Sequence, residues 1–189
     1  MEQGYHTPVL LEESVGLLSV DPAGTYVDLT FGGGGHSRRI LSLLGPEGRL
    51  YGFDQDRDTL ANRPDDGRFH YVESNFRFLR AALRLRGVAQ VDGILADLGV
   101  SSHHFDAVER GFSFRGTALL DMRMNRRGGR TAADVVNTYD RDALTRVLGD
   151  WGELSTPWKV AGCIERARAA APITTTDALV AVSYTHLRA

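Results

Sequence analysis

Four consecutive glycines, Gly32 to Gly35, are the first stretch of the sequence with residue types that could serve chemistry. They lie between a strand-like run, Tyr26–Leu29, and a helix-like run, Ser37–Leu44. Because glycine has no Cβ, this turn can adopt positive φ and let a ligand approach its main-chain N–H groups. The N-terminus of the following helix favours negative or electron-rich groups of such a ligand. A purely structural turn is the alternative interpretation.

A carboxylate follows the next apolar run of the chain. Leu50–Phe53 has the composition of a short strand, and Asp54 ends it, nineteen positions after Gly35. A carboxylate at the tip of the second strand of a βαβ unit is placed to accept hydrogen bonds from both hydroxyls of a ribose. The glycines and this carboxylate together indicate a nucleoside cofactor.

The residues around the glycines restrict the kind of cofactor. A dinucleotide fingerprint has a third small residue that lets helix and strand pack closely, whereas the two glycine frames here lead to Ser37 and Arg38. This departure weakens the case for NAD. A phosphate-binding P-loop needs Lys before Ser or Thr, and no Lys lies near this loop. S-adenosylmethionine, which carries ribose and adenine but no phosphate, fits the pattern better.

Two further strand ends supply candidate ligand contacts. Phe76 follows the predicted third strand, Phe69–Val72, where an adenine would be stacked, although a core residue at a helix start is an equal alternative. Asp97 follows the predicted fourth strand, Val91–Ala96. Ligands of open parallel sheets lie outside the carboxyl ends of the strands, which favours a site role for Asp97 over a helix cap.

The segment Phe105–Arg130 is rich in arginine and glycine, with phenylalanines interleaved. Arginines can pair with phosphates and stack on bases, so this segment predicts contacts with RNA. An exposed loop is the alternative, and the nearby Asp121 indicates that some of the arginines are paired internally. The predicted RNA-binding residues are Arg110, Arg115, Arg123, Arg126 and Arg127. A further arginine-bearing helix, residues 77–86, is more simply a solvated face.

Composition limits the class of protein. The 189 residues, 42% of them apolar, suffice for one globular domain with an insertion. The net charge of −2 gives no global signal for nucleic acid, so any RNA contact must come from a local patch. The single cysteine, Cys163, cannot form an internal disulfide, and neither a signal segment nor a long apolar run is present. We therefore expect a reduced, cytoplasmic protein without membrane contact.

Helices are predicted at both ends of the chain. At the start, Thr7 is the expected N-cap and Pro8 the first helical residue, and a capped helix is favoured over a ligand contact for His6 and Thr7. After Thr131 the pattern predicts a small helical bundle rather than further βαβ units. The predicted helix starts are the Thr131–Asp134 capping box, Asp140, Thr156 and Thr175 or Thr176.

These motifs together resemble the bacterial small-subunit ribosomal RNA (cytosine-N4)-methyltransferase family. The most specific segments are His6–Glu13, Asp28–Ser37, Asp92–Ser102, Glu109–Phe114 and Leu120–Met124. The resemblance implies an α/β fold of the class I methyltransferase (Rossmann-like) type, with helices on both faces of a parallel sheet and an inserted helical domain. It also implies S-adenosylmethionine as methyl donor and, as acceptor, a cytosine in the decoding region of 16S rRNA in the small ribosomal subunit.

The resemblance assigns site residues as well. The cofactor-binding residues carried over by position are Gly34, Gly35, His36, Asp54, Phe76, Asp97 and His104. His104 stands where family members often have Gln, and its ring is titratable. Asp97 is the predicted catalytic residue, as orienter or proton acceptor for the amine. No metal role is expected for His103 and His104, because adjacent histidines on a turn lack further ligands nearby.

The expected organisation has three parts: a cofactor-binding part (1–104), an Arg/Gly-rich loop with a helical insertion (105–182) and an atypical tail (183–189). The resemblance implies that family members continue further, with the last strands of the sheet. We therefore expect an N-terminal fragment whose fourth strand is a sheet edge. The competing hypothesis is a non-catalytic RNA-binding or ribosome-assembly protein that retains the cofactor pocket. A homodimer is compatible with the sequence, which does not reveal the oligomeric state.

Overall fold

A computed structural model describes residues 8–187. The chain divides into two compact units, one ending at Gly99 and the other beginning at Val100. The sequence places this division after residue 104, which lies inside helix α4 (Ser102–Asp106). Each unit has hydrophobic clusters of its own, so each is described by itself.

The first unit is built on a four-stranded parallel sheet with the order β3-β2-β1-β4. Val27 of β1 pairs with Tyr51 of β2 on one side and with Ile94 of β4 on the other. The carboxyl ends of these strands therefore meet at one edge of the sheet, and the predicted α/β class is confirmed. The strands are β1 (Thr25–Asp28), β2 (Arg49–Asp54), β3 (Phe69–Glu73) and β4 (Gly93–Leu95).

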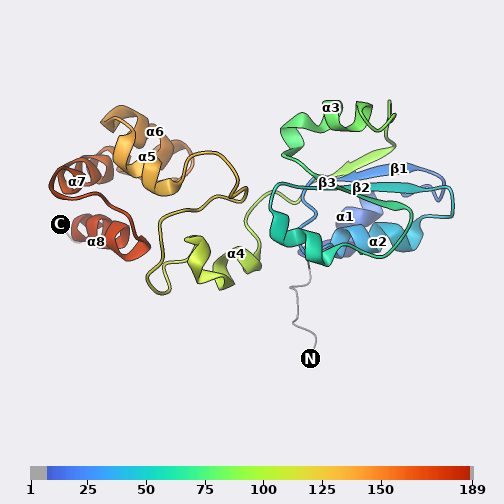
Figure 1. Ribbon diagram of the computed structural model, residues 1–189, viewed down its shortest axis with the longest axis horizontal. Coiled ribbons are helices and arrows are strands. Elements are labelled where there is room, and N and C mark those ends of the chain that lie inside the picture. The colour runs from blue at the N-terminus through green and yellow to red at the C-terminus, as the bar shows by residue number, and fades with distance from the viewer. Residues whose placement is uncertain (1–7, 188–189) are drawn as a thin grey trace. The chain divides into compact units, whose positions relative to one another are not determined.

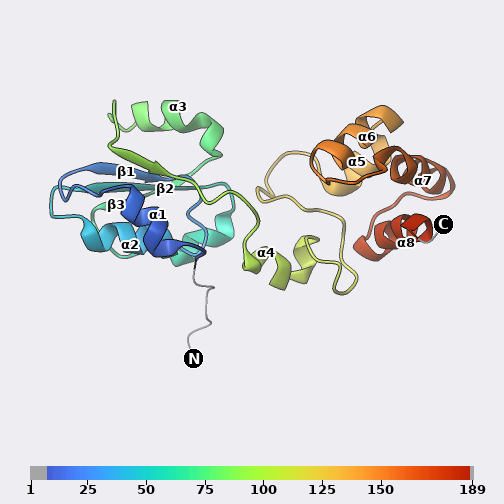
Figure 2. The same ribbon diagram turned by 180° about the vertical axis from the view of Figure 1, so that it is seen from behind.

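Helices cover both faces of this sheet, as Figures 1 and 2 show. Helices α1 (Leu11–Leu17) and α2 (Gly35–Leu43) lie on one face, and α3 (Leu79–Arg84) lies on the other. Successive residues of a strand point to opposite faces. Leu50 therefore belongs to the hydrophobic cluster on the face that α1 and α2 cover, and Tyr51 belongs to the cluster on the face that α3 covers. Burial on both faces explains why the strands read as nearly continuous apolar runs.

The first helix begins later than the sequence predicts. Helix α1 starts at Leu11 instead of Pro8, and its N-cap residue, Leu10, has a left-handed backbone with φ 51°. Pro8 packs against the glycine loop, because a Cβ on Gly35 would come within 2.3 Å of Pro8 Cγ. This packing replaces the predicted first turn of the helix. The predictions for His6 and Thr7 lie outside the described residues.

Strand β4 is shorter than the predicted Val91–Ala96 and forms one border of the sheet. Ile94, at its centre, is 45% exposed. The helix expected over residues 77–86 is also shorter, since a 3₁₀ turn, η2 (Phe76–Phe78), precedes α3. Another 3₁₀ helix, η1 (Arg57–Asn62), connects β2 to β3.

The second unit is helical, as predicted. Its buried hydrophobic cluster includes Leu120, Leu144 and Ile164. The predicted capping box is confirmed, because Thr131 Oγ1 accepts from Asp134 N–H at 3.0 Å while Asp134 accepts from Thr131 N–H at 2.8 Å. The elements are α4, η3 (Val108–Arg110), α5 (Ala132–Thr138), α6 (Arg141–Asp150), α7 (Pro157–Ala170) and α8 (Thr176–Leu187).

Residues 183–187 continue α8, and the predicted boundary at residue 183 stays a prediction. The other predicted helix starts also have structural counterparts: Asp140 accepts from Ala143 N–H at 2.7 Å, and Pro157 is the first residue of α7. Among the described residues, no helix combines the length and the apolar character needed to cross a membrane.

Arg68 fixes the connection that leads into β3. Its Nε and Nη2 atoms donate to the two carboxylate oxygens of Asp66, at 2.9 and 2.6 Å, and Nη1 donates to the carbonyl of Leu44 after α2. The two hydrogen bonds from the Arg68 guanidinium to the Asp66 carboxylate lower the pKa of Asp66 to about 2.

This pair predicts a defined pH dependence of stability. Because the pKa of Asp66 is lower in the folded chain than in the unfolded one, its contribution is present above about pH 4 and is lost as the pH falls toward 2. We expect Arg68→Ala to return the pKa of Asp66 toward 3.8, measured by NMR titration of its carboxyl carbon. The same change should lower the free energy of unfolding at pH 7, because it removes the hydrogen bonds to Asp66 and Leu44. Arg84→Ala, at an exposed position of α3, is the control, and an Asp66 pKa that stays near 2 without Arg68 would contradict the assignment.

Candidate functional site

The loop after β1 lies between the tips of the two neighbouring strands. Leu29 N–H donates to the carbonyl of Leu95 at the end of β4, and Phe31 N–H donates to the carbonyl of Phe53 in β2, both at 2.9 Å. Since β2 and β4 flank β1 in the sheet, the loop is held from both sides. The glycine run begins directly after these two contacts.

Asp54 attaches the glycine loop to the tip of β2. Its Oδ2 atom accepts from Gly32 N–H at 2.8 Å, and its Oδ1 atom accepts from Asp56 N–H at 2.8 Å. This geometry places a half-buried carboxylate beside the loop, with its orientation set by the backbone.

Asp97 is tied to the same loop from the side of β4. Its N–H donates to Thr30 Oγ1 at 2.8 Å, while its side chain is exposed. Thr30 N–H in turn donates to Asp28 Oδ1 at 3.1 Å. The structure therefore brings Asp54 and Asp97 to the two flanks of one loop, although they are separated by 43 positions (97 − 54) in the sequence.

The structural constraints that require glycine differ between positions of the loop. Gly32 and Gly34 both have positive φ, at 51° and 77°. A Cβ on Gly34 would lie 2.9 Å from the Phe31 ring, so packing alone requires glycine there. A Cβ on Gly32 would meet only Thr30 O, at 3.7 Å, so the space beside Gly32 is open. The Gly32 main chain is itself engaged, because its N–H donates to Asp54 Oδ2 and its carbonyl accepts from Asn62 Nδ2 at 3.0 Å.

Buried polar groups lie under the first turn of α2. Asp28, at the end of β1, is 1% exposed and accepts from Ser37 Oγ at 2.7 Å. Burial raises the pKa of the Asp28 carboxyl, against the lowering effect of this hydrogen bond. His36 is 5% exposed, and its Nε2 atom has no hydrogen-bond partner among the described residues. Leaving such an atom unsatisfied costs about 1–3 kcal/mol, which a polar ligand group reaching this turn would offset.

Phe76 is 41% exposed, so the interpretation as a core residue is wrong. It opens η2 directly after Asn75, whose Oδ1 atom accepts from Arg77 N–H at 2.9 Å. The Asn75 amide also donates to Gln55 Oε1 at 2.7 Å, which links the end of β3 to the end of β2. Phe76 thus presents an aromatic ring at the same carboxyl edge of the sheet as Asp54.

His104 belongs to the second unit. Its Nδ1 atom accepts from Ser101 N–H at 3.1 Å and lies 2.9 Å from Ser101 Oγ, which makes it part of the capping box of α4. Its ring lies 4.8 Å from that of Phe112, and the residue is 6% exposed. Sequence reasoning missed this capping role, which the Ser101–His104 spacing encodes. The assigned cofactor contact stays a prediction.

Two of the arginines predicted to bind RNA hold the segment Phe105–Arg130 together. Arg110 is 2% exposed and donates to the carbonyls of Arg123 and Met124 at 3.0 and 3.3 Å. Arg123 makes a two-pronged contact with Asp121, at 2.8 Å for each prong. The prediction for Arg110 is therefore corrected, because burial keeps its guanidinium from an RNA phosphate. The internal pairing expected from Asp121 is found at Arg123. Arg115, Arg126 and Arg127 are exposed.

The described part of the chain contains no ready set of metal ligands. Within residues 8–187, no three His, Cys, Asp or Glu side chains gather in a group that could hold an ion. His103 and His104 have ring centres 6.3 Å apart and lie on one short helix.

A comparison with known protein families shows which family the chain belongs to. The model of the MraW methylase family matches residues 3–188. The chain belongs to the MraW methylase family. This membership confirms the resemblance, and together with the parallel sheet it supports the predicted Rossmann-like methyltransferase fold.

Curated relatives are named ribosomal RNA small subunit methyltransferase H. The protein from Bacteroides fragilis (strain YCH46) is 58% identical over 174 residues, covering 92% of this chain and 57% of the relative. The protein from Flavobacterium johnsoniae is 54% identical over 175 residues, covering 93% and 58%. The protein from Christiangramia forsetii is 50% identical over 175 residues, with the same coverage. This MraW-family chain thus spans less than two thirds of the length of the relatives it matches.

The backbone of the glycine loop yields a prediction about stability. Gly34→Ala should lower the free energy of unfolding by about 1–3 kcal/mol, because alanine disfavours positive φ and its Cβ would press on Phe31. Gly16→Ala is the matched control: Gly16 lies inside α1 with open space around its Cβ position, so the change should stabilise by about 0.5–1 kcal/mol. Urea unfolding followed by circular dichroism measures both. Equal effects of the two changes would show that the loop carries no backbone constraint.

Proposed function

We propose that this chain is the cofactor-binding part of an S-adenosylmethionine-dependent methyltransferase that methylates the N4 amine of a cytosine in the decoding region of 16S rRNA. One observation carries the proposal: the loop after β1 is held between Asp54 and Asp97 at the carboxyl edge of a parallel sheet. Open sheets of this kind bind their ligands at that edge. The family and the names of the relatives add support for RNA as the substrate class.

The residues at this edge fit S-adenosylmethionine. Asp54 would accept hydrogen bonds from the ribose hydroxyls, and the exposed ring of Phe76 would contact the adenine. The amino-acid end would approach Gly34, Gly35 and His36, where the buried Nε2 atom offers an unsatisfied polar group. When bound, the cofactor supplies an electrophilic methyl group on a positively charged sulfur. The carboxylates at this edge suit that positive charge.

Asp97 is the proposed catalytic residue. The lone pair of the cytosine amine is delocalised into the ring, so this nitrogen is a poor nucleophile. An exposed carboxylate at the tip of β4 can accept a hydrogen bond from the amine, orient it and take the proton that the nitrogen releases on methylation. Fixing the reacting groups in place supplies much of the rate enhancement. The target base must be unstacked to enter such a site.

The second unit is the proposed RNA-binding part. Arg115, Arg126 and Arg127 are exposed on the segment between α4 and α5 and would contact phosphates. Arg110 and Arg123 would support them indirectly, since their hydrogen bonds hold the same segment in shape.

A second candidate is a non-catalytic RNA-binding or ribosome-assembly protein that retains the cofactor pocket. It is favoured by the position of β4, because Asp97 follows a strand that borders the sheet within the described residues. In this alternative the chain binds RNA and cofactor but transfers no methyl group.

Transfer of a radiolabelled methyl group from S-adenosylmethionine to unmodified small ribosomal subunits tests the proposal. We expect label in 16S rRNA, and Asp97→Ala should lower the rate about 10²–10⁴-fold. Asp97→Asn keeps an acceptor oxygen but not the charge, so it separates orientation from proton acceptance. Asp21→Ala removes an exposed carboxylate in the turn before β1, at the other end of the sheet, and should leave the rate unchanged. RNA binding without transfer by the unaltered chain would support the second candidate.

A further inference from the structure

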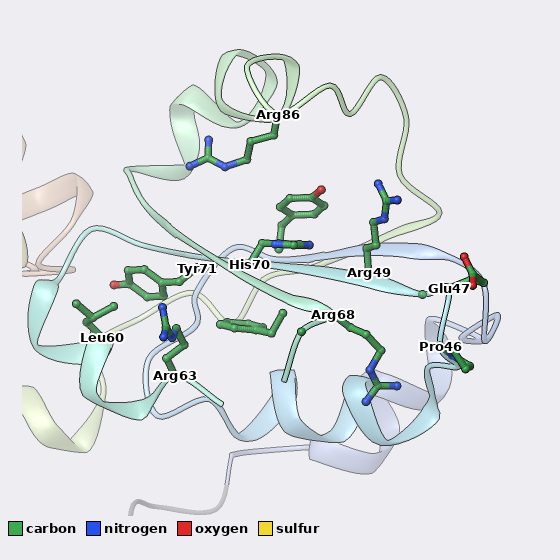
Figure 3. Close-up of a pocket in the computed structure, with 13 residues that line it drawn as sticks. Pro46, Glu47, Arg49, Leu60, Arg63, Arg68, His70, Tyr71 and Arg86 are labelled. Carbon is green, nitrogen blue, oxygen red and sulfur yellow. The ribbon is translucent and has the colours of Figure 1, made fainter. Parts of the chain in front are cut away.

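A pocket of about 800 Å³ lies along β3, the outer strand of the sheet, and extends from Arg49 to Tyr71 (Figure 3). Arg49, which opens β2, lines it, whereas Asp54 ends the same strand. At about 3.3 Å per residue, the two positions are separated by roughly 16 Å along the strand. The end of the pocket at Arg49 is therefore remote from Asp54.

The lining of this pocket is strongly basic. It includes Arg49, Arg63, Arg68 and Arg86 together with His70, but only one carboxylate, Glu47. The chain as a whole has a net charge of −2, so this concentration of positive charge is a local feature. Sequence reasoning missed it, because its members are scattered from the start of β2 to the residues after α3.

Three of these side chains, Arg49, His70 and Arg86, lie on the α3 side of the sheet, with the Arg86 guanidinium directed away from Arg49 (Figure 3). Tyr51 and His70 are register partners on β2 and β3, and their rings stack with centres 4.9 Å apart. Arg49 precedes Tyr51 by two residues and so points to the same face. Arg86 follows α3, which covers that face (Figure 3). Burial together with the positive charges of Arg49 and Arg86 lowers the pKa of His70, which agrees with this arrangement.

The charges of Arg49 and Arg86 are not neutralised internally. Neither guanidinium pairs with a carboxylate within residues 8–187, in contrast to Arg68, which is bound to Asp66. Arg86 is nevertheless positioned, because its Nη1 atom donates to the carbonyl of Ala82 at 2.9 Å. Positive charges on one face of the sheet that no carboxylate offsets favour the binding of an extended anion there.

We propose that Arg49, His70 and Arg86 form a phosphate-binding notch that holds the sugar-phosphate backbone of RNA. Guanidinium groups match phosphate oxygens in geometry and charge, and a neutral imidazole can donate one further hydrogen bond. The open and polar pocket suits a strand that passes across it better than an enclosed small molecule. The identity of the ligand as RNA rests on the proposed function. The notch adds an anchor at the end of the sheet remote from Asp97.

Fluorescence anisotropy with a labelled single-stranded RNA oligonucleotide tests the notch in the full chain. The double variant Arg49→Ala/Arg86→Ala should bind about 10–100-fold more weakly at low salt. The slope of log K against log salt should become shallower by about 1.4, as expected for two lost phosphate contacts to a single strand. Arg49→Gln/Arg86→Gln keeps side-chain length and should show the same loss, which provides the test if the alanine variant does not fold.

The control is Arg84→Ala, which removes an exposed arginine of α3 that does not line the pocket. It should leave RNA affinity near that of the unaltered chain. RNA affinity that is unchanged in the folded double variant, or an equal loss in the Arg84 variant, would overturn the notch. An acidic peptide such as polyglutamate that binds as tightly as RNA and is lost equally in the double variant would overturn RNA as the ligand.

Two further readouts separate this inference from the proposed function. Calorimetry should give the same affinity for S-adenosylmethionine in the double variant and the unaltered chain, because the notch is remote from the glycine loop. RNA binding that depends on Arg49 and Arg86 without any methyl transfer would support the notch while contradicting catalysis. Methyl transfer with RNA affinity unaffected by the two substitutions would support catalysis while contradicting the notch.

Discussion

The hydrogen bond from Gly32 N–H to the Asp54 carboxylate is the contact on which the candidate site depends. It fixes the loop after β1 against the tip of β2, and the hydrogen bond from Asp97 N–H to Thr30 Oγ1 does the same on the side of β4. A glycine loop without these two contacts would sample many conformations, because glycine restricts the backbone least of all residues. The sheet thus converts flexible residues into a fixed main-chain surface with a carboxylate on each flank.

Charge is distributed unevenly along the sheet. Carboxylates gather at the carboxyl ends of the strands, where burial and the charges of Asp54, Glu73 and Asp56 raise the pKa of Tyr71 to about 12. Arginines gather at the amino end of β2 and beside β3. A cationic methyl donor is favoured at the first end and a polyanion at the second. One sheet can therefore present charge of opposite sign at its two ends.

Local patterns predicted much of this fold, whereas long-range packing decided what they missed. The Thr131–Asp134 capping box and the start of α7 at Pro157 follow from residue types within a few positions. The late start of α1 depends on contact between Pro8 and Gly35, and the burial of Arg110 depends on carbonyls 13 and 14 residues away. Recognising the proposed notch required the strand register that pairs Tyr51 with His70. The hydrophobic periodicity of the sequence does not reveal that register.

Calorimetric titration with S-adenosylmethionine of the unaltered chain and of Asp54→Asn tests the central claim most directly. Asparagine retains one acceptor oxygen for the loop, and a thermal melt of each protein verifies folding. Loss of hydrogen bonds from ribose hydroxyls to a charged group should weaken binding about 10–100-fold, whereas Glu47→Ala, at the other end of the sheet, should bind as the unaltered chain does. An unchanged affinity in folded Asp54→Asn would contradict the account.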